Sequence, residues 1–295
     1  MALSGWIILD KPVGLGSTQA VGAVKRILRE AGEPKTKVGH GGTLDPLASG
    51  VLPIALGEAT KLAGRMLDAT KAYEFTVRFG EETDTLDAEG AAIETSDKRP
   101  TLEEIEAVLP TFTGPLEQIP PAYSALKIDG KAAYSRARAG EKLEMRPRSV
   151  TVQELQLVSS QTDGITLAAT VSKGTYIRSL ARDIARALGT VGHVTTLRRT
   201  RAGPFTLEKA ISLDFLTNAA KERRLDGAVL PLIAALDDIP ALPVTPGQAQ
   251  LLRHGQKLAG FPVTPGLHLA TDDNRPVALV EASVDGLRVV RGFNL

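Results

Sequence analysis

The stretch KAYEFTVRFG, residues 71–80, alternates apolar and polar side chains over its length. The apolar set is Tyr73, Phe75, Val77 and Phe79, and polar residues stand between its members. Because successive side chains of a strand point to opposite faces of a sheet, the stretch predicts a strand with one buried face. Such a strand needs neighbouring strands and a layer of helices to cover its apolar side.

Further strands and helices are predicted on both sides of this segment. Strands are expected at GWIILD (5–10), VTVQELQLVS (150–159), ITLAATVS (165–172) and HVTTLRRTRAG (193–203), the middle two as antiparallel neighbours. Helices are expected at VGAVKRILREAG (21–32), TLEEIEAVLP (101–110), the basic piece after residue 131, and SKGTYIRSLARDIARALG (172–189) with its arginines outward. Turns or loops are expected at the acidic GEETDTLDAEG (80–90) and at Asp129-Gly130, a pair suited to a hairpin.

The composition changes near residue 231. Residues 231–247 hold four prolines and no basic residue, which is typical of a domain boundary. Beyond them, short apolar runs are separated by glycine and proline. We therefore predict a large domain over residues 1–238 and a small β-rich domain over residues 239–295.

The composition also excludes several classes of function. The chain has no cysteine, so disulfides, thiolate catalysis and cysteine-ligated metals are ruled out. Its four histidines are scattered, which argues against a histidine-built metal site, and no cofactor or metal is expected. The N-terminal MALSGWIILDKP lacks the basic leader of a signal peptide, and no window reaches the roughly 18 apolar residues of a membrane span. These features predict a cytoplasmic protein.

Charge is unevenly distributed although the formal net charge is only +1. Residues 81–107 carry ten acids against two bases, whereas residues 127–148 carry seven bases against three acids. Residues 171–201 carry six arginines and one lysine against one acid. Solvated helix faces are one explanation of such blocks. The excess of arginine over lysine favours the other, contacts with phosphate groups.

The stretch GHGGTLDPLASG, residues 39–50, contains an isolated carboxylate, Asp45. Its glycines do not form a phosphate loop, because Thr43 and Leu44 follow where a Walker motif needs lysine and serine or threonine. A glycosidase would need two facing carboxylates, and the sequence supplies many acids without pairing them. From these residues alone, Asp45 is either a turn residue or a reactive group.

Several blocks together resemble one known family, the tRNA pseudouridine(55) synthases, also called the TruB family. The blocks are DKPVGLGST (10–18), GHGGTLDPLASGVLPIALGEATK (39–61), KAYEFTVRFG (71–80), IPPAYSALKIDGKAAYSRARAG (119–140) and SKGTYIRSLARDIARALG (172–189). The resemblance implies an α+β fold, with a mixed, largely antiparallel central sheet flanked by helices. It also implies an RNA-binding insertion at about 119–148 and a small C-terminal β-rich PUA-like domain.

The resemblance assigns roles to individual residues. Asp45 matches the catalytic aspartate, Tyr73 the tyrosine that lies against the target base, and Arg178 the arginine that pairs with the aspartate. His40 matches the histidine that occupies the T-loop beside the flipped-out nucleotide. Contacts to RNA are implied for Lys11, Lys61, Tyr176, Lys127, Arg136 and Arg198, the first two with support of the site as the other possible role.

The implied reaction isomerises the uridine at tRNA position 55 to pseudouridine. The bond from ribose C1′ to N1 breaks and a bond from C1′ to C5 forms, without redox cofactor or energy source. An ionised Asp45 can act as nucleophile or assist cleavage and proton transfer, and the sequence leaves attack at C1′, attack at C6 and a glycal route open. The expected partner is the tRNA T-arm stem-loop, bound by a monomer. The alternatives are a tRNA-binding folding factor without chemistry and a glycoside hydrolase.

Overall fold

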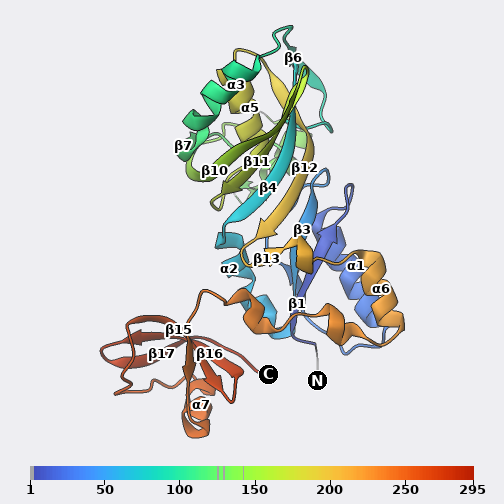
Figure 1. The fold of residues 1–295 in the computed structure, drawn as a ribbon. Helices are drawn as coiled ribbons and strands as arrows, with labels where there is room; N and C mark the ends of the chain where they lie inside the picture. The colour runs from blue at the N-terminus through green and yellow to red at the C-terminus, as the bar shows by residue number, and fades with distance from the viewer. Residues whose placement is uncertain (1–2, 125, 129, 142) are drawn as a thin grey trace.

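The chain is built around two separate β-sheets (Figure 1). A computed structural model describes residues 3–124, 126–128, 130–141 and 143–295. Within them, the larger sheet has nine strands, in the order β1-β3-β12-β4-β11-β10-β7 with β2 beside β3 and β13 beside β12. The smaller sheet has four strands, in the order β14-β15-β16-β17.

The large sheet is antiparallel at every pairing except one. Its strands are β1 (Gly5–Lys11), β2 (Val38–His40), β3 (Ser49–Leu56), β4 (Lys71–Phe79), β7 (Gly114–Gln118), β10 (Arg148–Gln161), β11 (Gly164–Val171), β12 (Gly192–Ala202) and β13 (Phe205–Thr206). The parallel pairing joins β3 to β12 over two residues of each strand. A mixed, largely antiparallel sheet with flanking helices confirms the predicted α+β fold, and the predicted antiparallel neighbours are β10 and β11.

Strand β4 lies in the middle of this sheet, between β11 and β12. Phe75, Val77 and Phe79 are buried together with residues of α5 (Ile177–Ala187) and α3 (Leu102–Val108), two helices that lie beside the sheet in Figure 1. They belong to the main apolar core. Tyr73 packs against the same core but is only partly buried.

The remaining elements include the other predicted helices. Helices are α1 (Ser17–Glu30), α2 (Ala63–Asp68), α4 (Ala133–Arg138), α6 (Leu213–Lys221) and α7 (Pro246–Arg253), with 3-10 turns at Gly57–Leu62, Leu109–Phe112, Leu207–Lys209, Leu225–Ala228 and Leu232–Ala235. The Thr101 hydroxyl accepts a hydrogen bond from the backbone N–H of Glu104, and the Glu104 carboxylate accepts one from the backbone N–H of Thr101, so α3 begins with a capping box.

Two sequence-based expectations are wrong in detail. The acidic segment predicted as a loop contains a short strand, β5 (Glu81–Thr83), which pairs with β6 (Ala92–Thr95). The arginines of α5 do not all point outward, because Arg178 is buried. A buried arginine needs carboxylate and carbonyl partners, and helical periodicity does not reveal where such partners lie.

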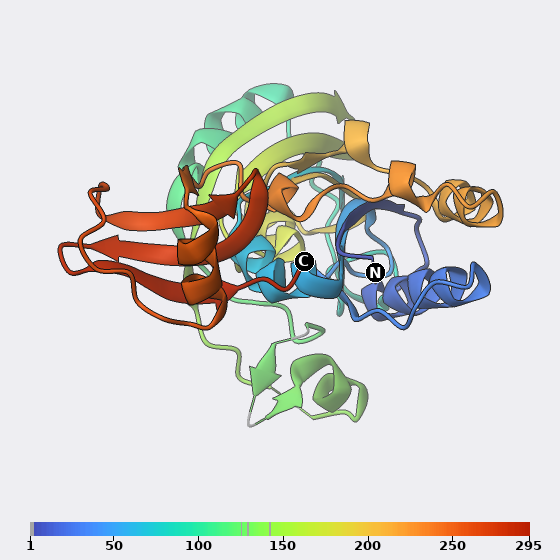
Figure 2. The ribbon, with the colours of Figure 1, turned by 90° about the horizontal axis from the view of Figure 1, so that it is seen from below.

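Residues 119–148 project from the body of the molecule (Figure 2). This insertion carries β8 (Lys127–Ile128), β9 (Lys131–Ala132) and α4. The strands β8 and β9 pair antiparallel, as a hairpin requires. Asp129 of the predicted hairpin turn lies outside the described residues.

The small sheet follows the proline-rich segment. It consists of β14 (Ala241–Pro243), β15 (Gly266–Asp272), β16 (Arg275–Ser283) and β17 (Gly286–Gly292), with α7 packed on it. Its Leu269 and Phe293 share an apolar cluster with Trp6 of β1, so the two sheets are in direct contact. A C-terminal β-rich unit is therefore present, and the boundary at residue 238 stays a prediction. Among the described residues, no helix is long and apolar enough to cross a membrane.

Gly50 is a position in the large sheet where the backbone leaves no room for a side chain. It has a φ of +97° in β3 and lies opposite Arg199 of β12. A Cβ atom at Gly50 would collide with the backbone carbonyl of Arg199. Because neither backbone can move without breaking the sheet, glycine is required here.

Gly50→Ala is therefore expected to lower the free energy of unfolding by about 3 kcal/mol or more. Urea unfolding followed by circular dichroism measures this. Gly64→Ala is the matched control, since Gly64 lies in α2 with open space around it. The control should be neutral or more stable, and equal effects of the two substitutions would contradict the requirement.

Candidate active site

The loop between β2 and β3 carries Asp45. It is fixed at Leu44, whose N–H donates to the Ser17 hydroxyl at 2.7 Å while that hydroxyl donates to the Leu44 carbonyl at 2.9 Å. Gly42 adopts a φ of +132°, which turns the chain into the loop. The carboxylate of Asp45 remains about one third exposed, with 37% of its side chain accessible.

Arg199, a buried arginine on β12, binds the backbone of the same loop. The Arg199 guanidinium donates to the carbonyls of Gly42, Thr43 and Val51 at 3.2, 3.3 and 2.7 Å. Its side chain is 1% exposed. A planar guanidinium can bind several carbonyls at once, so one side chain fixes the backbone on both sides of the turn.

Lys11 supports the loop in a similar way. It is fully buried, and its Nζ donates to the carbonyls of Pro12, Leu15 and Pro46 at 3.0, 2.6 and 3.4 Å. Burial lowers the pKa of Lys11 to about 8, while the nearby Asp45 carboxylate raises it in part. Of the two roles that the resemblance implied for Lys11, the buried position allows support of the site.

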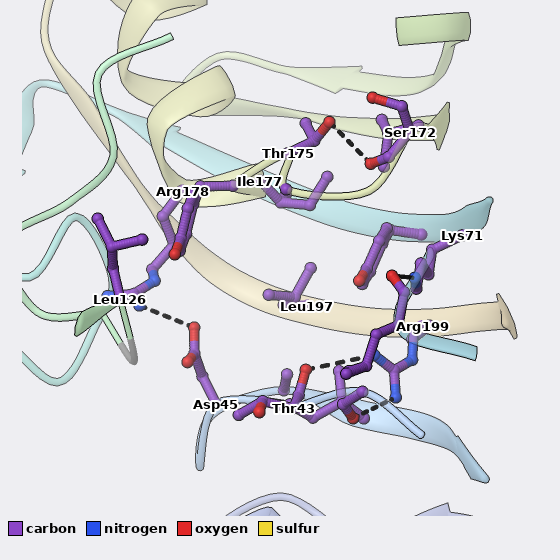
Figure 3. Close-up of a pocket in the computed structure, with 18 of the residues that line it drawn as sticks. Thr43, Asp45, Lys71, Leu126, Ser172, Thr175, Ile177, Arg178, Leu197 and Arg199 are labelled. Atoms are coloured by element: carbon purple, nitrogen blue, oxygen red, sulfur yellow. Dashed lines mark hydrogen bonds and ion pairs between the residues drawn. The ribbon is translucent and has the colours of Figure 1, made fainter. Parts of the chain in front are cut away.

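The Asp45 carboxylate meets the Arg178 guanidinium at 2.9 Å, as Figure 3 shows. Arg178 comes from the first turn of α5 and has only 5% of its side chain exposed. It also pairs with Asp87 at 3.2 Å and donates to the carbonyls of Thr85 and Tyr123 at 2.7 and 2.8 Å. The guanidinium is thus bound on several sides, and its position sets that of Asp45.

Asp87 is a site residue that the sequence reasoning missed. It is 2% exposed and receives Arg178 on the side opposite Asp45. The preceding Leu86 has a φ of +63°, an uncommon conformation for leucine, and its buried side chain anchors the turn that aims Asp87 and the Thr85 carbonyl at Arg178. The only signal in the sequence is the segment TDTLD (83–87), and its acidic residues are equally typical of a solvated loop.

Two cavities meet at the Asp45–Arg178 pair. The first, of about 620 Å³, is lined by Asp45, Arg178 and Tyr73, with Ile177 and Leu197 as apolar walls. Further lining side chains are cationic or aromatic: Lys71, Arg148, Arg199, Lys127 and Tyr176. A cavity of this size, with an apolar wall and a cationic rim, suits a nucleotide.

Lys71 lies at the edge of the first cavity. Its Nζ donates to the carbonyls of Leu67 and Ala69, at the end of α2, at 2.5 and 2.6 Å. Burial, and secondly the nearby Arg199 cation, lower the pKa of Lys71 to about 8. The cationic character of this cavity therefore depends on pH near neutrality.

The second cavity, of about 830 Å³, lies on the other side of the pair, between the start of α1 and α4 of the insertion. His40 lines it, and burial, with Arg199 as a second cause, lowers the pKa of His40. Among the described residues, the buried atoms His40 Nδ1 and Ser124 Oγ have no hydrogen-bond partner. Glu89 also lines this cavity, and its pKa is raised by burial and by Asp87 and Asp45.

Four residues predicted to contact RNA do not line either cavity: the buried Lys11 described above, Lys61, Arg136 and Arg198. Lys61 forms an ion pair with Glu58 and donates to the carbonyl of Gly292, which links the first 3-10 turn to the end of the small sheet. Arg136 pairs with Glu141 within the insertion, and Arg198 pairs with Asp10 on the sheet. By contrast, Tyr73, Tyr176, Lys127 and His40 line the cavities around Asp45.

Models of protein families match most of the chain. Residues 25–177 match the TruB family pseudouridylate synthase N-terminal domain, and residues 178–237 match the tRNA pseudouridylate synthase B C-terminal domain. The chain belongs to the TruB family of pseudouridylate synthases. It is therefore an isomerase, as the resemblance of its sequence blocks implied.

Curated relatives match over almost the whole length. A tRNA pseudouridine synthase B of Zymomonas mobilis is 60% identical over 99% of this chain and 97% of its own. One of Novosphingobium aromaticivorans is 59% identical over 99% of this chain and 98% of its own.

Solved structures share the fold. A chain in the structure of an H/ACA RNP bound to a substrate RNA containing 2′-deoxyuridine matches with a TM-score of 0.76 and 27% identity, over 99% of this chain and 85% of that one. A chain of a Cbf5-Nop10-Gar1 complex matches with a TM-score of 0.74 and 28% identity, over 98% and 84%. The fold of this chain is thus shared with a chain of an RNA-bound assembly and with a chain of a protein complex.

The lowered pKa of His40 predicts a pH dependence of stability. As the pH falls through about 6.5, the unfolded chain binds a proton at His40 that the folded chain does not bind. The stabilising contribution is therefore present above that pH and lost below it. Between pH 7.5 and 5.5, the wild type should lose more unfolding free energy than His40→Asn does.

Urea unfolding at the two pH values measures both losses. His254→Asn is the control, because His254 is exposed on α7 and lies outside both cavities. The control should follow the wild-type pH dependence. A His40→Asn protein that loses as much stability as the wild type would refute the assignment to His40.

Proposed function

We propose that this chain isomerises the uridine at position 55 in the T-loop of tRNA to pseudouridine. The observation that carries the proposal is the Asp45 carboxylate, held by Arg178 at 2.9 Å at the junction of two cavities. The names of the curated relatives support tRNA as the substrate. The charged rim of the first cavity is complementary to an RNA backbone.

The reaction needs a carboxylate and little else. The C1′–N1 bond breaks, the uracil turns, a C1′–C5 bond forms, and the proton on C5 is lost while N1 gains one, so atoms and electrons balance. Asp45 acts as nucleophile or assists cleavage and proton transfer. Arg178 orients the carboxylate through charge-assisted hydrogen bonds.

The first cavity fits a uracil released from its stack. Tyr73 provides an aromatic face, and Ile177 and Leu197 close the apolar side. Stacking on an aromatic ring contributes roughly 1–3 kcal/mol per base, which offsets part of the few kcal/mol needed to extrude a nucleotide. His40, on the other side of Asp45, is placed to fill the gap that the nucleotide leaves.

The T-arm stem-loop is the minimal substrate under this proposal. The insertion, with Lys127 on the first cavity and Tyr134 and Arg138 on the second, faces both places where RNA would enter. We also propose that the enzyme acts as a monomer. Lys61, Arg136 and Arg198 would contact RNA only outside the cavities.

A tRNA-binding folding factor is the second candidate. The cations that line the first cavity favour RNA binding by themselves, whether or not chemistry follows. Base-specific chemical labelling of pseudouridine in an unmodified T-arm stem-loop separates the two, because the isomerisation leaves mass unchanged. Released uracil would instead indicate glycoside hydrolysis.

Asp45→Asn is expected to lower pseudouridine formation below about one thousandth of the wild-type rate, since the amide is a poor nucleophile and base. Binding of the stem-loop should stay within about tenfold. Labelling measures the rate and filter binding measures the affinity. Asp183→Asn, on the outer side of α5, is the control and should keep wild-type activity. Substantial turnover by the Asp45→Asn variant would refute the proposed catalytic role of Asp45.

Arg178→Lys is expected to reduce turnover by about 100-fold or more, because an ammonium group cannot bind Asp45, Asp87 and two carbonyls at once. Arg182→Lys, one turn along α5, is the matched control and should act within about threefold of wild type. Single-turnover labelling at saturating RNA gives both rates. Equal rates for the two variants would remove Arg178 from the site.

A further inference from the structure

Helix α1 presents a continuous polar stripe to solvent. The stripe consists of Thr18, Gly22, Lys25, Arg26 and Arg29, all exposed. At 100° per residue, these positions fall within an arc of about 100° on one side of the helix. Apolar residues of α1 occupy the opposite side and are buried in the main core: Ala20, Val21, Val24, Ile27 and Leu28.

The cations of the stripe are unpaired. Within the described part of the chain, Lys25, Arg26 and Arg29 form no ion pair with a carboxylate. Some exposed cations elsewhere do have such partners, among them Arg99 with Asp163 and Lys173 with Asp68. Three adjacent cations without internal partners are available to an external anion.

Gly22 is a second, independent observation. It lies in the interior of α1 with ordinary helical backbone, and a Cβ atom there would meet nothing within 4 Å. Glycine destabilises a helix interior relative to alanine, and no contact within the described chain requires it here. A glycine on the stripe leaves the helix backbone open to close approach by a ligand.

The stripe begins at the candidate active site. Thr18 and its neighbour Gln19 line the second cavity, on the side of Asp45 where His40 lies. From Thr18 to Arg29 the helix rises by about 16 Å. The stripe therefore runs from the cavity wall outward along the surface, which is the course an RNA strand leaving the cavity would take.

Two simpler explanations do not account for the stripe. Arg29 is in the last turn of α1, where a cation stabilises the helix end, but Lys25 and Arg26 lie further in. A basic amphipathic helix can bind a membrane surface through its apolar face. The apolar face of α1 is buried against the sheet and against α6, so it is not available to lipid.

We infer that the α1 stripe binds the sugar–phosphate backbone of the substrate RNA where it leaves the second cavity. Lys25, Arg26 and Arg29 each pair with a phosphate, and the open backbone at Gly22 lets the strand lie against the helix. This inference rests on the proposed function for the identity of the RNA. It adds a binding surface to which no role was assigned from the sequence.

The test uses the full chain and an unmodified tRNA transcript. Lys25→Gln/Arg26→Gln/Arg29→Gln should raise the dissociation constant about tenfold or more, and lower the slope of log affinity against log salt by about 2 to 3. The turnover rate at saturating RNA should stay within about twofold of wild type, because the stripe does not touch the reacting atoms. Filter binding at several salt concentrations and labelling of pseudouridine provide these readouts.

A charge-matched control separates local contacts from the effect of net charge. Lys209→Gln/Lys221→Gln/Arg223→Asn removes three exposed cations at or next to α6, outside both cavities. The control should keep the wild-type affinity and salt slope. Equal losses in the two triple variants, or no loss in the α1 variant, would overturn the inference.

Gly22→Gln tests the close approach without changing charge. Its melting temperature should equal or exceed that of the wild type, because glutamine is the better helix former. Its affinity for the transcript should nevertheless fall, and unchanged affinity would contradict the close approach. RNA binding is measured independently of turnover. A wild-type protein that binds the transcript but makes no pseudouridine would refute the proposed function. The inference about the α1 stripe would then still be decided by the affinities and salt slopes of the variants.

Discussion

The buried guanidinium of Arg178 connects parts of the chain that are far apart in sequence. It binds Asp45 from the loop before β3, Asp87 from the acidic segment, and the carbonyl of Tyr123 at the start of the insertion. A buried arginine is costly unless its donors and its charge are matched. The fold must therefore bring these segments together before Arg178 can be buried, and the Asp45 carboxylate is placed as a consequence. The Asp87 carboxylate stays buried, whereas the Asp45 carboxylate is partly exposed at the cavities.

The loop that carries Asp45 is held mainly by cations bound to carbonyl groups. Arg199 and Lys11 are both buried, and each donates to three backbone carbonyls. Carbonyl partners leave the positive charge of each cation uncompensated, whereas a carboxylate partner would neutralise it. The loop is consequently fixed beside buried positive charge. Burial, and secondly the Arg199 cation, lower the pKa of the nearby His40. The same groups thus provide both the rigidity and the electrostatics of the site.

Periodicity predicted the sheet well because burial of one face controls it. The alternation in residues 71–80 placed Phe75 in the core and Tyr73 on the same face, and both placements follow from the pleat. The burial of Arg178 could not be predicted from α5, since it depends on Asp87 and on a leucine in the left-handed conformation. The resemblance to a known family singled out Asp45, Tyr73 and Arg178 as candidate site residues, which periodicity alone could not do. For positions matched only as basic residues, such as Lys61, the role in RNA binding stays a prediction, because the ion pair with Glu58 is as compatible with a basic residue there as an RNA contact is.

The two cavities differ in the charges that line them. This difference bears on where the phosphate backbone of a bound RNA can lie. The first cavity has a cationic rim with Lys71 and Arg148, whereas the second contains Glu89 and Asp84 close to Asp45. A phosphate is attracted to the first and repelled by the carboxylates of the second. Arg138 and the paired Arg178 are the arginines that line the second cavity, so a backbone that passes it needs further cations outside the cavity. The α1 stripe begins at Thr18 on the wall of this cavity and carries its three cations further along the helix, so it offers such partners on a path that leads outward from the cavity.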